Sequence, residues 1–426
     1  MKKFLAAFLS AMMVVSMFAG CTKKENTPTS STEVKDEKKQ TEPVEITYWQ
    51  HSSTARDEMM QSIADDFTKA NPDIKVKMEF IPEADYNNKL IPALATATAP
   101  DVFQIQSGMI AQLAKSSSIQ PLDESVMSTQ DIQNQFIPAT VDGLKYDGKY
   151  YGMPTDTQTV LMFWNKGLFK AAGLDPEKGP QTTDELFDLA KKLTKYEKGA
   201  MVQSGWGHKG YAPEITSLVE MYGGKFYDAS ANKFVFADDA NAMKAINDTA
   251  ALIRGKEAVY TEQFMKNWAG FREGKVAMMI GHPAMIGNLK TTAPDVDYGL
   301  SLLPTKDGKR AACVTSWGYV MSKKANSVAA TKFIDFLSSE AVEKKWTLKT
   351  GELPARKALL EDAELTADAK VKLALGSLNE SFVGPIQTSA MNGVMKKMYE
   401  EIMLTDKAIE AIAKDYQAKL NAEVSK

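Results

Sequence analysis

The side chains best suited to chemistry in this sequence are aromatic, amide or acidic, and they lie at the ends of predicted strands. They are Trp49, His51, Gln104, Gln106, Asp156 and Gln158. Planar amides and carboxylates form paired hydrogen bonds with neighbouring hydroxyl groups, and aromatic faces pack against the C–H surface of a ring. This combination suits a neutral ligand with many hydroxyl groups, of which a sugar is the natural example.

Catalytic motifs are missing from the sequence. The three histidines, His51, His208 and His282, form no His-Glu-x-x-His pair, and there is no Gly-x-Ser-x-Gly elbow and no phosphate-binding Gly-x-x-x-x-Gly-Lys loop. Neighbouring carboxylates such as 65–66 and 238–239 fit solvated helix surfaces. A glycosidase needs two carboxylates placed across a bond, and nothing in the sequence singles out such a pair. We therefore expect no enzymatic activity, no cofactor and no metal site.

These residues must be positioned by alternating strands and helices. Period-two alternation predicts strands at 44–50 and 74–81, and further strand candidates are 101–105, 159–164, 276–280, 298–303 and 314–322. Four-residue apolar spacing and capping signals predict helices at 54–70, 182–193, 326–337 and 405–424. The alternation indicates an α/β protein with mainly parallel sheets, whose ligands bind beyond the carboxyl ends of the strands.

Composition limits the class of protein. Hydrophobic residues make up 44% and charged residues 25% of the 426, which is ordinary for a globular protein. The net charge of −3 gives no electrostatic reason to expect nucleic acid as a partner. Residues 44–426 exceed the roughly 250–300 residues that one core supports, so we expect two domains.

The start of the chain predicts secretion and a lipid anchor. Lys2 and Lys3 precede an apolar run, 4–18, that is shorter than the roughly 20 residues needed to span a bilayer. Ala19 and Gly20 then precede Cys21. Residues 1–20 resemble a bacterial lipoprotein signal peptide, with Phe18 where such signals usually have Leu. The resemblance implies that Cys21 becomes the lipidated, palmitate-carrying first residue of the mature protein; an ordinary secretory signal is the alternative.

Residues 21–43 are expected to form the lipidated cysteine and a flexible tether. The segment 22–43 contains Thr, Ser, Pro, Lys, Asp, Glu, Asn and Gln, with Val34 as its apolar side chain. Such a segment cannot bury enough surface to offset its ordering entropy. The protein should therefore lie outside the cytoplasm, held at the cell membrane only by its lipid. Because Cys21 is assigned to the anchor, Cys313 is left without a disulfide partner.

A set of short segments in fixed order resembles the family 1 extracellular solute-binding proteins, the receptors of ABC-type sugar importers. The segments are 99–102, 147–154, 163–169, 172–174, 180–185, 222–224, 271–278, 317–323 and 351–354. Each match is short, but together they span some 250 residues, and the similarity extends over nearly all of 44–426. The chain has Trp164-Asn165-Lys166 where the family usually has Tyr-Asn-Lys, and 311–313 where it usually has a Gly-Gly pair.

This resemblance implies a two-lobed fold of the type II periplasmic-binding-protein kind, with the ligand cleft between the lobes. The chain should cross between lobes near 155–158, near 314–317 and again around 361–365. Lobe one is then 44–155 plus 318–362, and lobe two is 156–317 plus 363–426. Closure on a ligand would be a hinge motion.

The resemblance and the strand ends together extend the set of expected binding residues. Trp317, followed by Gly318 at a crossing, is the expected sugar platform. Tyr211 and Glu214 match a segment that lines the cleft in related receptors, and His282 follows the strand 276–280. For each of these residues the alternative is a structural role in a core, a turn or a loop. Weaker candidates are Trp206, Trp268 and Arg356, whereas Trp164 is expected in a core.

We therefore interpret the sequence as a monomeric carbohydrate receptor that delivers a sugar or oligosaccharide to the permease of an ABC importer. One alternative is a receptor of the same fold for another solute, such as a polyamine or a glycerophosphodiester. A polyamine requires several carboxylates in the cleft, and a phosphodiester requires Arg or helix N-termini. The other alternative is an extracellular glycoside hydrolase lipoprotein.

Overall fold

The first strand and helix follow directly from the residue pattern at the start of the folded region. Val44–His51 alternates between buried and more accessible residues and forms β1, and Thr54–Ala70 forms α1. The computed structural model describes residues 43–424 except 53, 209, 211, 229–230, 232, 262–263, 265–267 and 386–388. Pro43–Lys426 forms one compact unit.

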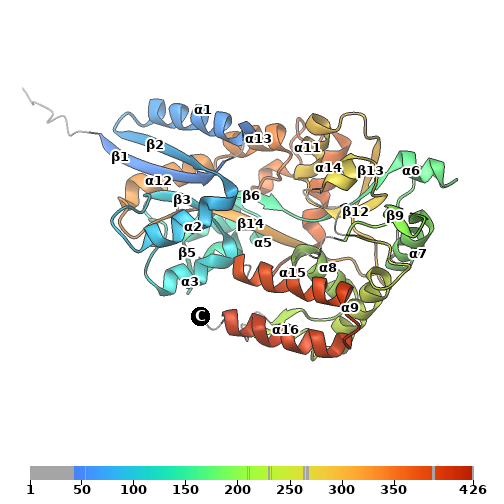
Figure 1. Ribbon diagram of the computed structural model, residues 1–426. Coiled ribbons are helices and arrows are strands. Elements are labelled where there is room, and N and C mark those ends of the chain that lie inside the picture. The colour runs from blue at the N-terminus through green and yellow to red at the C-terminus, as the bar shows by residue number, and fades with distance from the viewer. Residues whose placement is uncertain are drawn as a thin grey trace, which may run out of the picture. The chain divides into compact units, whose positions relative to one another are not determined.

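The helices and strands alternate along this unit (Figure 1). The first part contains β1, α1, β2 (Ile74–Ile81), α2 (Glu83–Leu94), β3 (Val102–Gln106), α3 (Ile110–Lys115), α4 (Thr129–Gln135), α5 (Pro138–Val141), β4 (Lys145–Tyr146), β5 (Lys149–Tyr150) and β6 (Gly152–Gln158). The middle contains β7 (Leu161–Asn165), α6 (Lys166–Ala171), α7 (Thr183–Leu193), β8 (Lys195–Glu197), β9 (Ala200–Gln203), α8 (Ala212–Met221), β10 (Tyr227–Asp228), β11 (Lys233–Phe234), α9 (Ala240–Ile253) and α10 (Ala269–Arg272). The last part contains β12 (Met278–Gly281), α11 (Ala284–Thr292), β13 (Tyr298–Ser301), β14 (Ala312–Met321), α12 (Ser327–Leu337), α13 (Glu340–Thr350), α14 (Ala369–Gly376), β15 (Ser381–Val383), α15 (Ser389–Leu404) and α16 (Ile409–Val424).

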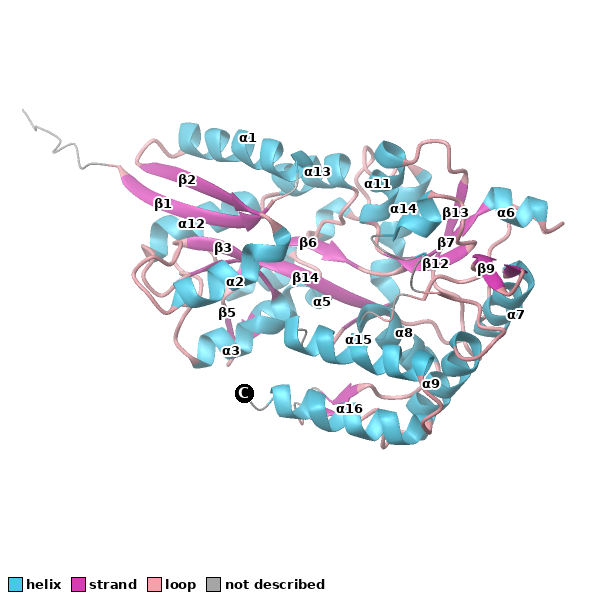
Figure 2. Ribbon diagram, viewed as in Figure 1, coloured by secondary structure: helices cyan, strands magenta, loops and turns pink. Residues whose placement is uncertain are grey.

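A six-stranded sheet carries most of the predicted binding residues. Its strand order is β15-β14-β3-β1-β2, and β6 also pairs with β14. The pairs β1–β2, β1–β3 and β14–β15 are parallel, whereas β14 runs antiparallel to β3 and β6. Helices cover both faces of this sheet, as Figure 2 shows. Tyr48 and Phe333 belong to the apolar cluster under α1 and α12, and Phe103 and Tyr86 to the cluster under α2 and α3.

A second, three-stranded sheet lies at the centre of the other large core. Its order is β12-β7-β13, and both pairs are antiparallel. The expectation of mainly parallel sheets is therefore wrong for this sheet, because alternation and length report burial but not strand direction. The apolar residues of β7 and β12 pack with α7, α8, α9, α15 and α16.

Two strands connect these cores. β14 begins among residues of the second core, with Ala312 and Val314, and ends among those of the first, with Tyr319 and Met321. β6 pairs with β14 over Gly152–Gln158, so the two strands run side by side between the cores (Figure 1). This arrangement agrees with the chain crossings expected near 155–158 and 314–317. The exact lobe boundaries stay a prediction.

Other predicted elements match the structure closely. α7 begins after Thr182, whose hydroxyl accepts a hydrogen bond of 3.1 Å from the backbone N–H of Glu185, as the capping signal predicted. The last helix differs from the prediction, because 405–408 form an irregular connection between α15 and α16 and the helix begins at Ile409. Among the described residues, no helix is long and apolar enough to cross a membrane.

Candidate functional site

Sheet order brings four sets of predicted binding residues together. β1, β3, β14 and β6 are consecutive neighbours in the sheet. Trp317 of β14 lies opposite Gln106 of β3 and opposite Asp156 of β6. Residues widely separated in the sequence therefore meet on adjacent strands, near the carboxyl ends of β1 and β3, where α/β proteins bind ligands.

Trp317 and Tyr319 point to opposite sides of the sheet, beside a β-bulge in the neighbouring strand β6. The pairing of β14 with β6 shifts register between Trp317 and Gly318. In a regular strand Trp317 and Tyr319 would share a face, but Tyr319 packs under α1 and α12 whereas Trp317 packs on the α2 side. The extra residue of this bulge is Thr155 of β6, because Trp317 pairs with Asp156 and Gly318 pairs with Pro154, whereas β14 pairs with β3 without a shift. A Cβ atom at Gly318 would meet the end of the Leu144 side chain, which would have to shift.

Trp317 forms a ring cluster with His51 and Tyr86. The Trp317 and His51 ring centroids are 4.5 Å apart at an interplanar angle of 39°, and Tyr86 lies 6.3 Å from Trp317. Trp317 is half-buried, whereas His51 is 7% exposed. The Tyr86 hydroxyl donates to the backbone carbonyl of Gln104 at 2.6 Å, which ties α2 to β3. The cluster thus joins three elements around one partly accessible indole ring.

Arg56 is a central contact that the sequence pattern did not reveal. Its guanidinium contacts Nε2 of His51 and forms an ion pair with Oε1 of Glu352. Oε2 of Glu352 accepts a 2.7 Å hydrogen bond from Nε1 of Trp346. Burial opposes the charge on Arg56, but Glu352 and then Asp156 raise the pKa of its guanidinium overall.

Electrostatics keep His51 uncharged. Burial, and then the nearby Arg56 cation, lower the pKa of His51 to about 3, with the Gln104 side chain acting in the opposite direction. Burial, and then Asp156, raise the pKa of Glu352, while Arg56 lowers it. The four side chains of His51, Arg56, Asp156 and Glu352 therefore form one electrostatically linked group.

The amide and acidic residues of β3 and β6 complete this region. Asp156 is 4% exposed and accepts hydrogen bonds from the Thr155 hydroxyl at 2.5 Å and from Nε2 of Gln158 at 2.8 Å. Gln104 is buried, and its Oε1 has no hydrogen-bond partner among the described residues. Such amide and carboxylate oxygens can accept hydrogen bonds from ligand hydroxyl groups.

Trp49 and His282 lie beside this group rather than in the ring cluster. Trp49 is half-buried, and Nζ of Lys89 lies 4.6 Å from its ring centroid. Nδ1 of His282, just after β12, is 3.1 Å from the backbone carbonyl oxygen of Thr159. Thr159 directly follows Gln158, so this contact brings His282 to the end of β6.

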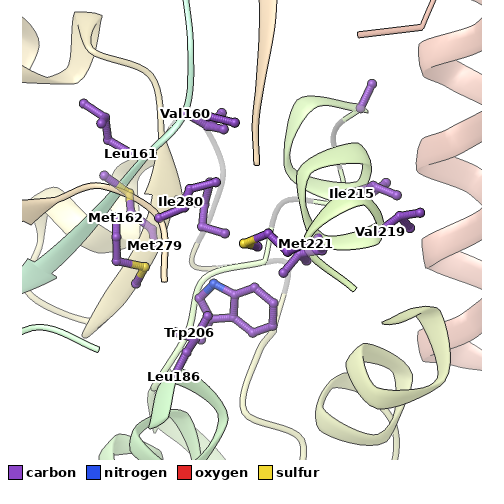
Figure 3. Close-up of a cluster of buried hydrophobic side chains, with 14 of the residues drawn as sticks. Val160, Leu161, Met162, Leu186, Trp206, Ile215, Val219, Met221, Met279 and Ile280 are labelled. Carbon is purple, nitrogen blue, oxygen red and sulfur yellow. The ribbon is translucent and has the colours of Figure 1, made fainter. Parts of the chain in front are cut away.

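Glu214 has a different environment. It is fully buried in α8, with Oε1 3.2 Å from Nδ1 of His208. The His208 ring packs 5.0 Å from the Trp206 ring and 4.8 Å from that of Tyr399. Figure 3 shows Trp206 within the apolar core, beside Leu186 and Met221. Glu214 is therefore packed in the second core in this structure.

The remaining candidates have structural contacts or cannot be placed. Trp164 is buried, as expected, and its Nε1 donates to the Pro176 carbonyl at 2.9 Å. Nε of Arg356 donates to the Ser338 carbonyl, and its guanidinium carbon is 4.4 Å from the Phe136 ring centroid. Trp268 is half-buried before α10. Tyr211 and Cys21 lie outside the described residues.

Sequence reasoning missed Arg56, Tyr86 and Glu352. Glu352 lies in the segment 351–354, which had been recognised only as a family-like motif. Arg56 and Glu352 are 296 positions apart, and no local pattern predicts their contact. Within the described residues, no group of three or more His, Cys, Asp or Glu side chains could hold a metal ion.

Comparison with known proteins shows the family of this chain. Residues 62–373 match the family described as bacterial extracellular solute-binding protein. The maltotriose-binding protein of Pyrococcus abyssi (strain GE5 / Orsay) is 25% identical over 88% of this chain and 81% of its own length. The sn-glycerol-3-phosphate-binding periplasmic protein UgpB of Escherichia coli (strain K12) is 27% identical over 74% of both chains.

A solved structure shows the same fold. The ABC transporter solute-binding protein of Thermotoga lettingae TMO, bound with α-D-tagatose, superimposes with a TM-score of 0.76. It covers 89% of this chain and all of its own chain, at 24% identity. The fold is therefore the two-lobed α/β fold of these receptors. Since the family match spans well over half of the sequence, the chain belongs to the bacterial extracellular solute-binding proteins.

Proposed function

We propose that this protein is an extracytoplasmic carbohydrate receptor that delivers a sugar or oligosaccharide to an ABC-type importer, without chemical change to the ligand. The observation that carries the proposal is the half-buried Trp317 ring, packed at a tilt against His51 and flanked by amide and acidic residues of β3 and β6. An aromatic face with planar hydrogen-bonding groups around it suits a pyranose or furanose ring. The maltotriose- and tagatose-binding relatives support the same class of ligand.

The charges around Trp317 favour a neutral sugar over a phosphate ester. Arg56 is already paired with Glu352, and Asp156 adds a further acidic group. His51 is uncharged at neutral pH because its pKa is about 3. A phosphate group would have to compete with Glu352 for Arg56 and would lie near Asp156. sn-Glycerol 3-phosphate, the ligand named for the Escherichia coli relative, is therefore a less suitable ligand for this site than a neutral sugar.

The proposed binding set comprises Trp317, His51, Gln104, Gln106, Asp156 and Gln158. Trp49, Tyr211, Glu214 and His282 stay predictions from the sequence. The lobe boundaries, 44–155 plus 318–362 and 156–317 plus 363–426, are proposals as well. Leu359 packs with the second core, so the third crossing would begin before the predicted 361–365.

A thermal-shift screen tests the proposal. Residues 43–426 are mixed in turn with maltotriose, D-tagatose, spermidine and sn-glycerol 3-phosphate. A ligand at about 100 times its dissociation constant should add about 2.7 kcal/mol of stability. We expect a sugar to raise the melting temperature of the wild type and not that of Trp317→Ala. Stabilisation by spermidine or by the phosphate ester alone would contradict the carbohydrate assignment.

A second assay separates a receptor from a hydrolase. Incubation of the protein with oligosaccharides should produce no new reducing ends, because the proposed site only binds. Time-dependent release of reducing ends, lost in Asp156→Asn, would contradict the proposal.

The N-terminal signal leads us to propose a lipid anchor at Cys21, which would hold the receptor at the cell membrane as a monomer. Cys21→Ser should release the protein into the medium or periplasm, and labelled palmitate should no longer be incorporated. Labelling that is unchanged in Cys21→Ser would contradict the anchor.

A further inference from the structure

Arg56 and Glu352 link the ligand region to the segment that follows α13. We propose that Glu352 and Arg56 are positioning residues that fix the His51 ring against Trp317, with the ring proton on Nδ1. The inference rests on the proposed function only for its effect on binding, since the position of the proton is a property of the unliganded protein. Neither Arg56 nor Glu352 needs to contact the sugar for this role.

The first step is the direction of the hydrogen bond between Arg56 and His51. The Arg56 guanidinium contacts Nε2 of His51. A guanidinium carries only donors, so Nε2 must be the acceptor. A neutral imidazole has one donor and one acceptor nitrogen. The proton of an uncharged His51 must therefore be on Nδ1.

The second step is the surroundings of Nδ1. Nδ1 of His51 and Oε1 of Gln104 are both buried, and strict geometry gives neither a hydrogen-bond partner among the described residues. The Gln104 side chain raises the pKa of His51, as an acceptor facing the ring would. A small movement would let Nδ1–H donate to Oε1 and satisfy both atoms. With the proton on Nδ1, the ring can accept a hydrogen bond from Arg56 at Nε2 and donate one to Gln104 at Nδ1.

The third step is the rigidity of Glu352. The residue is 3% exposed, and each carboxylate oxygen has a partner, Arg56 for Oε1 and the Trp346 indole for Oε2. Its backbone N–H donates to the Thr350 hydroxyl at 3.1 Å. The carboxylate is thus held by α13 on one side and holds Arg56 of α1 on the other. Loss of its charge would free Arg56 to leave His51.

The fourth step connects this contact to the crossing strands. Leu353, the residue after Glu352, pairs with Thr157 of β6 through backbone hydrogen bonds of 2.8 and 3.3 Å. Thr157 directly follows Asp156. The segment that positions Arg56 is therefore bonded to the strand that carries Asp156. Glu352 and its neighbour Leu353 thus connect α1 with β6, the two elements that carry Arg56 and Asp156.

Histidine NMR tests the position of the proton directly. The sequence has three histidines, so ¹⁵N-histidine labelling of residues 43–426 gives few signals, and His51→Asn assigns one of them. A two-bond ¹H–¹⁵N spectrum without ligand should show His51 protonated at Nδ1 and unprotonated at Nε2. Arg56→Gln and Glu352→Gln should shift this pattern toward protonation at Nε2, whereas Glu352→Asp should restore it. Glu343→Gln, which replaces a buried acid of α13 whose pKa is raised to about 8, should leave it unchanged.

The same spectra can overturn the proposal. A wild-type His51 protonated at Nε2, or a pattern unchanged in Arg56→Gln, would show that Arg56 does not fix the ring. If Glu352→Gln fails to fold, Arg56→Lys provides the test, because it retains a donor but loses the planar fork; a shifted His51 signal is then expected.

Binding measurements separate the positioning role from a purely structural one. Calorimetry with maltotriose or D-tagatose, whichever raises the melting temperature, should give about a tenfold weaker affinity for Glu352→Gln and wild-type affinity for Glu343→Gln. Unchanged affinity in a Glu352→Gln variant whose His51 signal has shifted would contradict the positioning role. If neither sugar binds, the proposed function fails and the tautomer result stands by itself.

Discussion

His51 and His208 have the same types of residue beside them, but the tryptophan next to each differs in exposure. Each ring packs beside a tryptophan, Trp317 at 4.5 Å and Trp206 at 5.0 Å. Each is also linked to a buried glutamate, His51 through Arg56 and His208 directly at 3.2 Å. The tryptophans differ, because Trp317 is half-buried and Trp206 is fully buried. Residue types alone therefore do not distinguish a binding surface from a core.

The difference arises from the strands that carry the two tryptophans. Trp317 packs on the α2 side of the six-stranded sheet, beside the amide and acidic groups of β3 and β6. Trp206 follows β9 and packs among Leu186, Met221 and the strands of the second sheet (Figure 3). The partly accessible ring of Trp317 can contact a ligand, whereas the fully buried ring of Trp206 stabilises the fold.

Substitution of the two tryptophans gives the largest expected contrast. Trp206→Ala should lower the free energy of unfolding by about 3 to 5 kcal/mol, because it leaves a cavity in a filled core. Trp317→Ala should lower it by about 1 to 2 kcal/mol, because part of the ring is already in water. Urea unfolding of both variants measures the difference. Equal losses would mean that Trp317 is a core residue, and the site would have to be placed elsewhere.

Substitution of Glu352 and Glu214 should give the next largest difference in the free energy of unfolding. Glu352→Gln removes the counter-charge of Arg56, and a guanidinium cannot become neutral by losing its proton, so the substitution should cost about 3 kcal/mol. Glu214→Gln keeps an oxygen for the backbone N–H of Gly210, 3.3 Å away, and should cost about 1 kcal/mol. The measurement is again urea unfolding, at one pH and salt concentration. A larger loss for Glu214→Gln would identify the His208 region as the more strongly charged of the two.

Acid titration examines the His51 side of the comparison. The pKa of His51 is lowered from 6.5 to about 3, so below pH 6.5 the unfolded chain binds a proton that the folded protein does not. The contribution of His51 to stability is complete above pH 6.5 and is lost as the pH falls toward 3. Between pH 6 and pH 5 the wild type should lose about 1 kcal/mol more than His51→Asn. Parallel stability curves would show that His51 titrates normally and is not held beside a cation.

Glu343 should give the opposite pH dependence. Burial, against hydrogen bonds from the backbone N–H groups of Arg356 and Ala355, raises the pKa of Glu343 to about 8. The folded protein therefore retains a proton that the unfolded chain releases, and stability falls as the pH rises from 4.5 to 8. Between pH 6 and pH 7 this loss should be about 1 kcal/mol in the wild type and absent in Glu343→Gln. Identical curves for both proteins would contradict the raised pKa.

Much of the fold could be predicted from the sequence, because local patterns determine it. The alternation of 44–50 and the apolar spacing of 54–70 gave β1 and α1 almost to the residue. Strand direction in the second sheet could not be predicted, because antiparallel and parallel neighbours leave the same burial pattern in a strand covered on both faces.

The site was only partly predictable for a related reason. The amides, acids and rings at strand ends were identified because strand ends are visible in the sequence, and sheet order then brought them together. Arg56 and Glu352 meet through the tertiary fold alone, across 296 positions. Glu214 is acidic and lies in a segment that resembles cleft-lining segments of related receptors. Only the packing of Trp206 and Tyr399 around His208 reveals that Glu214 is buried.

The substitution with the smallest expected effect, Lys89→Gln, tests whether the binding surface around His51 includes Trp49. Lys89 lies over the Trp49 ring and forms an ion pair with Glu79, both near the surface. Lys89→Gln should cost about 0.5 kcal/mol of stability, because exposed cation–π and ion pairs are weak. It should change sugar affinity by less than about twofold, since the contact is separate from the Trp317 ring cluster. A tenfold loss in calorimetry would instead place Trp49 in the binding surface, because the position of its ring would then matter to the ligand.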